Sequence, residues 1–196
     1  MANDVDSNVI EAYTDGSSFP GGGARPTIGG IGVFMGEGHT ENMGRSIRHG
    51  KITNQTMELA AAHAGLQAIQ RHTPTLPPPA TTVIYTDSAY VMNCMTKWIM
   101  LWEANGWRTK NKKPVQNGET LRSMLPIVKE FGVVFVRVRA HESVASTIDI
   151  DRDTMKHVVG NREADRLASQ AAAEGARSAC YIQRGVCVNT EELLAD

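Results

Sequence analysis

The stretch Val9-Ile10-Glu11-Ala12-Tyr13-Thr14-Asp15-Gly16-Ser17 begins as a short apolar run and ends in turn-forming residues. Residues 83–88, Val-Ile-Tyr-Thr-Asp-Ser, have nearly the same ending. A carboxylate at the end of a buried strand, beside small polar residues, is where an α/β sheet exposes its chemistry. We therefore expect strands over residues 9–13 and 83–85, each followed by a turn that presents an aspartate.

Hydrophobic spacing around these two strands predicts the rest of the fold. Apolar residues from Leu59 to Ile69 recur at intervals of 3, 4 and 3, which predicts a helix over 57–70. Gly36-Glu37-Gly38 separates two apolar runs, as in a β-hairpin. The pattern indicates an α/β fold with a mixed five-stranded sheet, an antiparallel meander plus parallel strands, flanked by helices. The other expected elements are strands over 28–35, 40–48 and 133–138 and helices over 89–101, 119–131 and 161–174, the last ended by Gly175.

Composition fits one globular domain and excludes a disordered chain, because 41% of the 196 residues are hydrophobic and 21% are charged. We expect that domain over residues 9–175, with an insertion at 142–160, after a short N-terminal extension (1–8) and before a C-terminal tail (176–196). Lys and Arg (20) nearly balance Asp and Glu (21), so a nucleic-acid site would have to come from local charge clustering.

Targeting features are missing from the sequence. Its first 17 residues have no Lys or Arg and no apolar core, and its three cysteines form no CxxC pair. The densest apolar stretches are far short of the roughly 20 residues that a membrane helix needs. We expect an intracellular monomer that is neither secreted nor membrane-bound.

Four carboxylates are the candidate chemistry. Besides Asp15 and Asp87, Glu58 opens the Ala-rich helix, and Asp165 lies beside the apolar face of the last helix. Each alone could be a turn former, a cap or a helix-start charge. Four acids at one sheet edge would repel each other unless cations held them together, and an oxygen-only site suits Mg²⁺ or Mn²⁺.

Six segments together resemble type 1 ribonuclease H, in that family's order and over residues 10–175. They are YTDGS (13–17), TNQTMELAA (53–61), YTDSAYV (85–91), WIMLWEANGWRTKNKKPVQN (98–117), VRVRAH (136–141) and GNREADRLA (160–168).

This resemblance implies an endonuclease that hydrolyses the RNA strand of RNA/DNA hybrids and leaves 3′-hydroxyl and 5′-phosphate ends. It implies two Mg²⁺ ions, with Mn²⁺ as a possible substitute, bound by Asp15, Glu58, Asp87 and Asp165. Asp15 would bridge both ions, with Glu58 and Asp87 on one and Asp165 on the other. Such a pair can activate a water and stabilise the leaving oxygen.

The resemblance also implies a mobile histidine. His141 is the candidate, because it ends the segment VRVRAH (136–141) that matches the family. The segment between His141 and Asp165 is longer than in the family, because of the insertion at 142–160. His157, inside the insertion, is therefore a rival.

Residues 97–113 combine five Lys or Arg with one Glu and three tryptophans, which favours contact with a DNA backbone. The alternative is a tryptophan core plug beside a solvated basic loop. The family pattern implies RNA-strand contacts at Gly16, Ser17, Asn54 and Gln55. The candidate DNA-strand contacts are Thr53, Asn93, Trp98, Trp102, Lys110, Lys112, Lys113 and Asn117.

Two other functions remain open at this point. One is a catalytically silent hybrid-binding module on the same scaffold, since a fold does not guarantee chemistry. The other is a different phosphoryl-transfer enzyme of the superfamily, such as an integrase or exonuclease.

Overall fold

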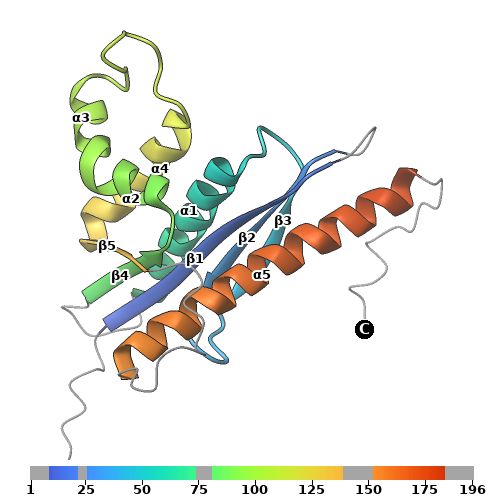
Figure 1. The fold of residues 1–196 in the computed structure, drawn as a ribbon. Helices are drawn as coiled ribbons and strands as arrows, with labels where there is room; N and C mark the ends of the chain where they lie inside the picture. Colours follow the sequence, from blue (N-terminus) through green and yellow to red (C-terminus); the bar gives the residue numbers. More distant parts are fainter. Residues whose placement is uncertain (1–8, 22–25, 74–80, 139–151, 184–196) are drawn as a thin grey trace, which may run out of the picture.

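In the computed structural model the described residues are 9–21, 26–73, 81–138 and 152–183, with side chains described as far as residue 178. They form a central sheet between two layers of helices (Figure 1). Within these ranges none of the helices combines the length and the apolar character that a membrane crossing requires.

The sheet has five strands in the order β3-β2-β1-β4-β5. β1 pairs antiparallel with β2, and β2 with β3, whereas β1–β4 and β4–β5 are parallel. This confirms the mixed sheet expected from the sequence. The strand bounds are β1 Val9–Phe19, β2 Ile28–Phe34, β3 Met43–Ile47, β4 Thr81–Thr86 and β5 Val134–Arg137.

β1 does not stop at Tyr13, so the expected turn over residues 14–17 is wrong. The strand continues to Phe19 because Asp15 pairs with Gly32 and Phe19 with Ile28 of β2. Glycines on β2 also let a helix approach closely: a Cβ at Gly32 would lie 2.1 Å from the backbone oxygen of Ala164. The aspartate thus sits within a paired strand.

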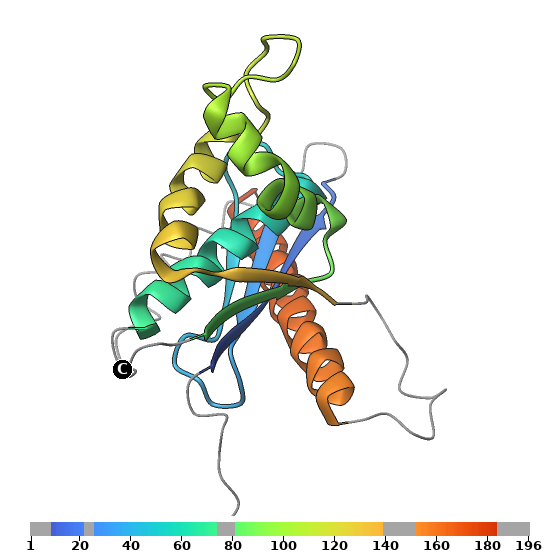
Figure 2. The ribbon, with the colours of Figure 1, turned by 90° about the vertical axis from the view of Figure 1, so that its left-hand side faces the viewer.

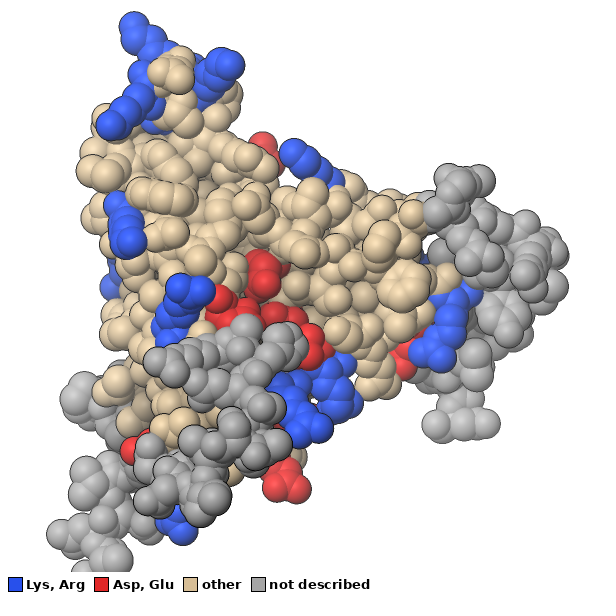
Figure 3. Space-filling model, in the orientation of Figure 1, with Lys and Arg blue, Asp and Glu red and all other residues tan. Residues whose placement is uncertain are grey.

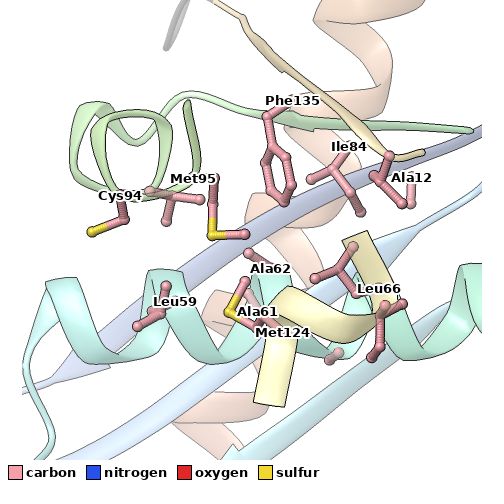
Figure 4. Close-up of a cluster of buried hydrophobic side chains, with 14 of the residues drawn as sticks. Ala12, Leu59, Ala61, Ala62, Leu66, Ile84, Cys94, Met95, Met124 and Phe135 are labelled. Carbon is pink, nitrogen blue, oxygen red and sulfur yellow. The ribbon is translucent and has the colours of Figure 1, made fainter. Parts of the chain in front are cut away.

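Helix α1 (Asn54–His72) covers one face of the sheet. Thr53 caps it by accepting a hydrogen bond from the backbone N–H of Thr56, whose hydroxyl in turn accepts from the N–H of Thr53. Such reciprocal capping fixes where a helix begins. Figure 4 shows Leu66 and Ala62 of α1 packed near Ile84 of β4, and all three are fully buried. The Ala-rich helix is therefore buried between the sheet and α4 (Gly118–Phe131).

The expected helix over 89–101 is built from three pieces. α2 (Ala89–Asn93) passes through a π-helical segment (Cys94–Trp98) into α3 (Ile99–Ala104). The basic loop that follows returns through a bridge between Arg108 and Pro114. We call α3 and residues 105–117 the basic arm, which stands away from the sheet in Figure 1.

Helix α5 (Arg152–Gln183) lies on the opposite face from α1 and α4 (Figure 2). The expected end at Gly175 is wrong, because the helix continues for two turns. Gly175 serves close packing instead: a Cβ there would lie 2.8 Å from side-chain carbons of both Ile28 and Ser46. The helix also begins earlier than residue 161, so residues 152–160 of the expected insertion are helical. The domain limits at 9 and 175 stay predictions.

Candidate active site

Three carboxylates meet where β1 and β4 approach the first helix. Asp15 lies on β1, Glu58 is in the second turn of α1, and Asp87 directly follows β4. One oxygen from each lies within 4.8 Å of the other two. Parallel pairing explains the convergence of the aspartates, since Tyr13 pairs with Tyr85 and each carboxylate lies two residues further on. Asp15 is only 8% exposed, and Glu58 and Asp87 are half-buried.

Glu58 has a strongly raised pKa. Burial, followed by the neighbouring charges of Asp15 and Asp87, raises the pKa of Glu58 to about 9. A hydrogen bond from the backbone N–H of Gly16 opposes this shift by stabilising the carboxylate. A Cβ at Gly16 would lie 2.1 Å from the backbone nitrogen of Glu58, so only glycine allows this approach of β1 to α1.

Asp87 is held by a residue that the sequence argument missed. The Nδ2 of Asn161 on α5 donates a hydrogen bond of 3.2 Å to the Oδ2 of Asp87. Asn161 is 7% exposed. Its place one helical turn before Asp165 is the signal that could have identified it, because residues four apart share a helix face.

Asp165 is near the three acids but outside their closest grouping. Its charge contributes to the raised pKa of Glu58, as the weakest of the three neighbouring acids. Ser169 donates a hydrogen bond of 3.3 Å to its Oδ1. The structure thus brings three of the four predicted carboxylates together, and Asp165 is near enough for its charge to act on Glu58.

The chemistry of the cluster fits a divalent cation. Glu58 Oε2 is buried without a hydrogen-bond partner among the described residues, and burial of such an atom is costly. Three acids within 4.8 Å supply oxygen ligands only, the set that Mg²⁺ and Mn²⁺ prefer. A cation would remove both the repulsion and the unpaired oxygen.

Charge is divided between the sheet and the basic arm. In Figure 3 acidic side chains gather in the middle of the face, and Lys and Arg gather at the tip of the arm. Trp98, Trp102 and Lys110 line a hollow of about 340 Å³, with the two ring centroids 5.5 Å apart. Trp98 is 37% exposed, whereas Trp102 and Trp107 are partly buried and pack against the core, so the core-plug interpretation fails only for Trp98. The hollow joins three of the DNA-strand candidates, and Lys112 and Lys113 are exposed on the same loop.

The RNA-strand candidates lie where β1 meets the start of α1. The Ser18 hydroxyl donates to Oδ1 of Asn54, which links these two elements. Asn54 and Gln55 are exposed in the first turn of α1, and Ser17 is half-buried on β1. These residues border the side of the cluster that carries Glu58.

Three other DNA-strand candidates are involved in local structure. Thr53 is the cap of α1, as described above. Asn117 has a left-handed backbone (φ 58°) and donates to the Tyr90 hydroxyl at 2.9 Å, while Asn93 is half-buried at the end of α2. Asn117 also lines a larger cavity of about 670 Å³, together with Lys51, Arg122 and other residues.

Of the two candidate histidines, the structure describes only His157. His141 lies outside the described residues, so its role stays a prediction. His157 is described: its Nδ1 lies 3.0 Å from the Tyr13 hydroxyl, and its ring centroid lies 4.5 Å from that of Tyr85.

Fold and site define a mixed α/β domain with a cluster of carboxylates where β1 and the end of β4 meet α1. The family model described as RNase H matches residues 7–173. Ribonuclease H of Bordetella pertussis is 36% identical over 173 residues, which cover 87% of this chain and 94% of the relative. Human ribonuclease H1 is 33% identical over 168 residues, 85% of this chain but 51% of the human protein. The chain belongs to the ribonuclease H family.

Solved structures agree with this fold. The solution structure of the PFV RNase H domain has a TM-score of 0.62 and 24% identity, covering 85% of this chain and 94% of that domain. A foamy viral protease-reverse transcriptase in complex with RNA/DNA hybrid has a TM-score of 0.60 and 22% identity, covering 85% of this chain and 20% of that protein.

Proposed function

We propose that this chain is an endonuclease that hydrolyses the RNA strand of RNA/DNA hybrids with two bound Mg²⁺ ions, which Mn²⁺ can replace. Its products would carry 3′-hydroxyl and 5′-phosphate ends. The observation that carries this proposal is the convergence of Asp15, Glu58 and Asp87 within 4.8 Å, in a chain of the ribonuclease H family. The sequence relatives cited above bear the name ribonuclease H.

The cations would be held by Asp15, Glu58, Asp87 and Asp165. When bound, such a pair supplies activation of the attacking water and stabilisation of the leaving oxygen. The chain's own contribution is to orient the carboxylates before substrate arrives. This support comes from the N–H of Gly16 for Glu58, Nδ2 of Asn161 for Asp87 and Oγ of Ser169 for Asp165.

The substrate would bind across the cluster and the basic arm. Because Ser18 donates to Oδ1 of Asn54, the Nδ2 group of Asn54 remains a donor for a ribose 2′-hydroxyl, the group that distinguishes RNA from DNA. Gly16, Ser17 and Gln55 would line the RNA strand beside it. On the DNA side, the Trp98–Trp102 pair would pack on deoxyribose while lysines of the arm neutralise phosphates.

The test separates cleavage from binding. Asp87→Asn keeps the size of the side chain but removes a charge from the cluster, so it should abolish Mg²⁺-dependent cleavage and leave hybrid binding in EDTA unchanged. Glu37→Gln is the matched control, since Glu37 is exposed in the β2–β3 turn. Full cleavage by the Asp87→Asn variant would overturn the proposed role of the cluster.

The same assay distinguishes the alternatives. Wild-type protein that binds the hybrid tightly but cuts nothing would be the silent module. Cutting of duplex DNA in preference to the hybrid would indicate another phosphoryl-transfer enzyme of the same superfamily.

A further inference from the structure

The first turns of α5 fall within the expected insertion (142–160), and they contact β1, which carries Asp15, and β4, which Asp87 directly follows. We propose that His157 is a positioning residue that, with Tyr13 and Tyr85, clamps α5 to β1 and β4 and so places Asn161 and Asp165 at the carboxylate cluster. This inference rests on the proposed function, because it assigns the clamp to cation binding.

The centre of the clamp is a stack of three rings. Tyr13 and Tyr85 lie side by side, with centroids 4.7 Å apart and planes 14° apart. His157 lies against both, 4.5 Å from Tyr85 and 6.0 Å from Tyr13 between centroids. Its Nδ1 forms a 3.0 Å hydrogen bond with the Tyr13 hydroxyl. His157 is thus fixed by packing and by a directed bond.

A second set of contacts holds the same turn of the helix. Lys156 forms an ion pair with Glu11 on β1, and the Tyr85 hydroxyl donates to Glu11 at 3.1 Å. One turn further on, a Cβ at Gly160 would lie 2.5 Å from the ring of Tyr13, so glycine allows α5 to lie on that ring.

Helix and strand periodicity carry this anchoring to the cluster. His157, Asn161 and Asp165 are four residues apart and lie on one stripe of α5. Tyr13 precedes Asp15 by two residues on β1, so the two side chains lie on the same strand face, and Tyr85 lies two residues before Asp87, which directly follows β4. Fixing His157 on the tyrosines therefore sets where Asn161 meets Asp87 and where Asp165 approaches Glu58.

This arrangement gives His157 a different role from a mobile proton carrier. A proton carrier must reach the reacting phosphate, whereas the described contacts hold the His157 ring against Tyr13 and Tyr85. The two roles predict different kinetics, because a positioning residue alters cation binding and a proton carrier alters the rate at saturating cation.

The test compares His157→Ala with His157→Asn, whose side-chain amide can replace Nδ1 in the bond to Tyr13. Two Mg²⁺ titrations are made. In the first, Mg²⁺ is added to the free protein and its binding is measured by the shift in Tm. In the second, the rate of hybrid cleavage is measured as a function of Mg²⁺ concentration. Loss of an outer-shell partner typically weakens metal binding about 10- to 100-fold. His157 acts one step further out, so we expect half-saturating Mg²⁺ to rise about three- to tenfold in His157→Ala, with rescue in His157→Asn.

His63→Ala is the matched control, because His63 on α1 contacts the Ser123 hydroxyl at 3.4 Å, away from α5. It should leave half-saturating Mg²⁺ unchanged. If His157→Ala does not fold, Tyr13→Phe removes only the hydroxyl and should raise half-saturating Mg²⁺ in the same direction.

Three outcomes would overturn the clamp or its basis. Unchanged Mg²⁺ binding with a slower rate at saturating Mg²⁺ would assign His157 to the chemistry instead. No change in either quantity would leave His157 without a role in the site. A wild-type chain that does not respond to Mg²⁺ in either titration would overturn the proposed function itself.

Discussion

Asn161 donates a hydrogen bond of 3.2 Å to Asp87, which joins the last helix to the end of β4. Both groups sit at the carboxylate cluster, and Asn161 is almost fully buried. The bond occupies one oxygen of Asp87 and leaves the other for a cation. Asn161 is thus an outer-shell partner of the proposed cation site.

Removal of this bond should weaken cation binding. We expect Asn161→Ala to raise the Kd for Mg²⁺ by about tenfold, because Asp87 loses its orienting donor. Isothermal titration of the free protein with Mg²⁺ measures this. Gln170→Ala, an exposed amide on the same helix, should not change the Kd. An unaltered Kd in Asn161→Ala would show that Asp87 needs no such support.

Without divalent cations, stability should fall as pH rises. The pKa of Glu58 is about 9 in the folded chain against an ordinary 4.5, so the folded state keeps a proton that the unfolded state releases. The resulting stability is fully present below pH 4.5 and is lost as pH rises toward 9. Mg²⁺ should reduce this loss, because it replaces the proton among the carboxylates.

Glu58→Gln provides the matching measurement. Its amide does not titrate, so Tm in EDTA should depend less on pH than in the wild type, and the two Tm values should diverge as pH rises. Parallel Tm profiles would contradict the assignment of this pH dependence to Glu58.

The close approach of β1 to α1 predicts a large effect of one methyl group. Gly16→Ala would place a Cβ 2.1 Å from backbone atoms of Met57 and Glu58, which can be relieved only by moving the helix or the strand. We expect a loss of at least about 1–3 kcal/mol in the free energy of unfolding, together with loss of cleavage. Denaturant unfolding checks this. Gly118→Ala, whose Cβ would lie 3.7 Å from Val115, should be close to neutral.

The basic arm predicts salt-dependent binding. If Lys110 contacts a phosphate, Lys110→Gln should weaken hybrid binding and reduce the slope of log K against log salt by about 0.9. The Asp87→Asn background allows this titration without cleavage. Arg71→Gln, which removes an ion pair with Glu41, should leave the slope unchanged. An unchanged slope in Lys110→Gln would remove Lys110 from the interface.

Local sequence features predicted much of the fold and the candidate site. Apolar runs bounded by turn-forming residues identified all five strands, and the helical spacing of apolar residues identified the Ala-rich helix. The aspartates at 15 and 87 were found because each comes two residues after a short apolar run, although β1 continues past Asp15 to Phe19. Their grouping with Glu58 agrees with the expectation that acids would meet at one end of the sheet.

The features that the sequence did not predict depend on contacts between distant segments. β1 extends past Tyr13 because β2 supplies pairing partners, which no local pattern of turn-forming residues can indicate. Taken alone, Gly175 predicts the end of a helix. In the structure, glycine at this position allows α5 to pack closely against Ile28 and Ser46 on the neighbouring strands. The contacts of His157 and Asn161 were likewise invisible, since their partners lie 144 and 74 residues away.

The most direct test of the account is cleavage of an RNA/DNA hybrid labelled on both strands, with Mg²⁺ and with EDTA, beside single-stranded and duplex RNA. The account predicts that only the RNA strand of the hybrid is cut, only with Mg²⁺, and that its products carry 3′-hydroxyl and 5′-phosphate ends. Cutting that persists in EDTA, or that affects the DNA strand or duplex RNA equally, would contradict it.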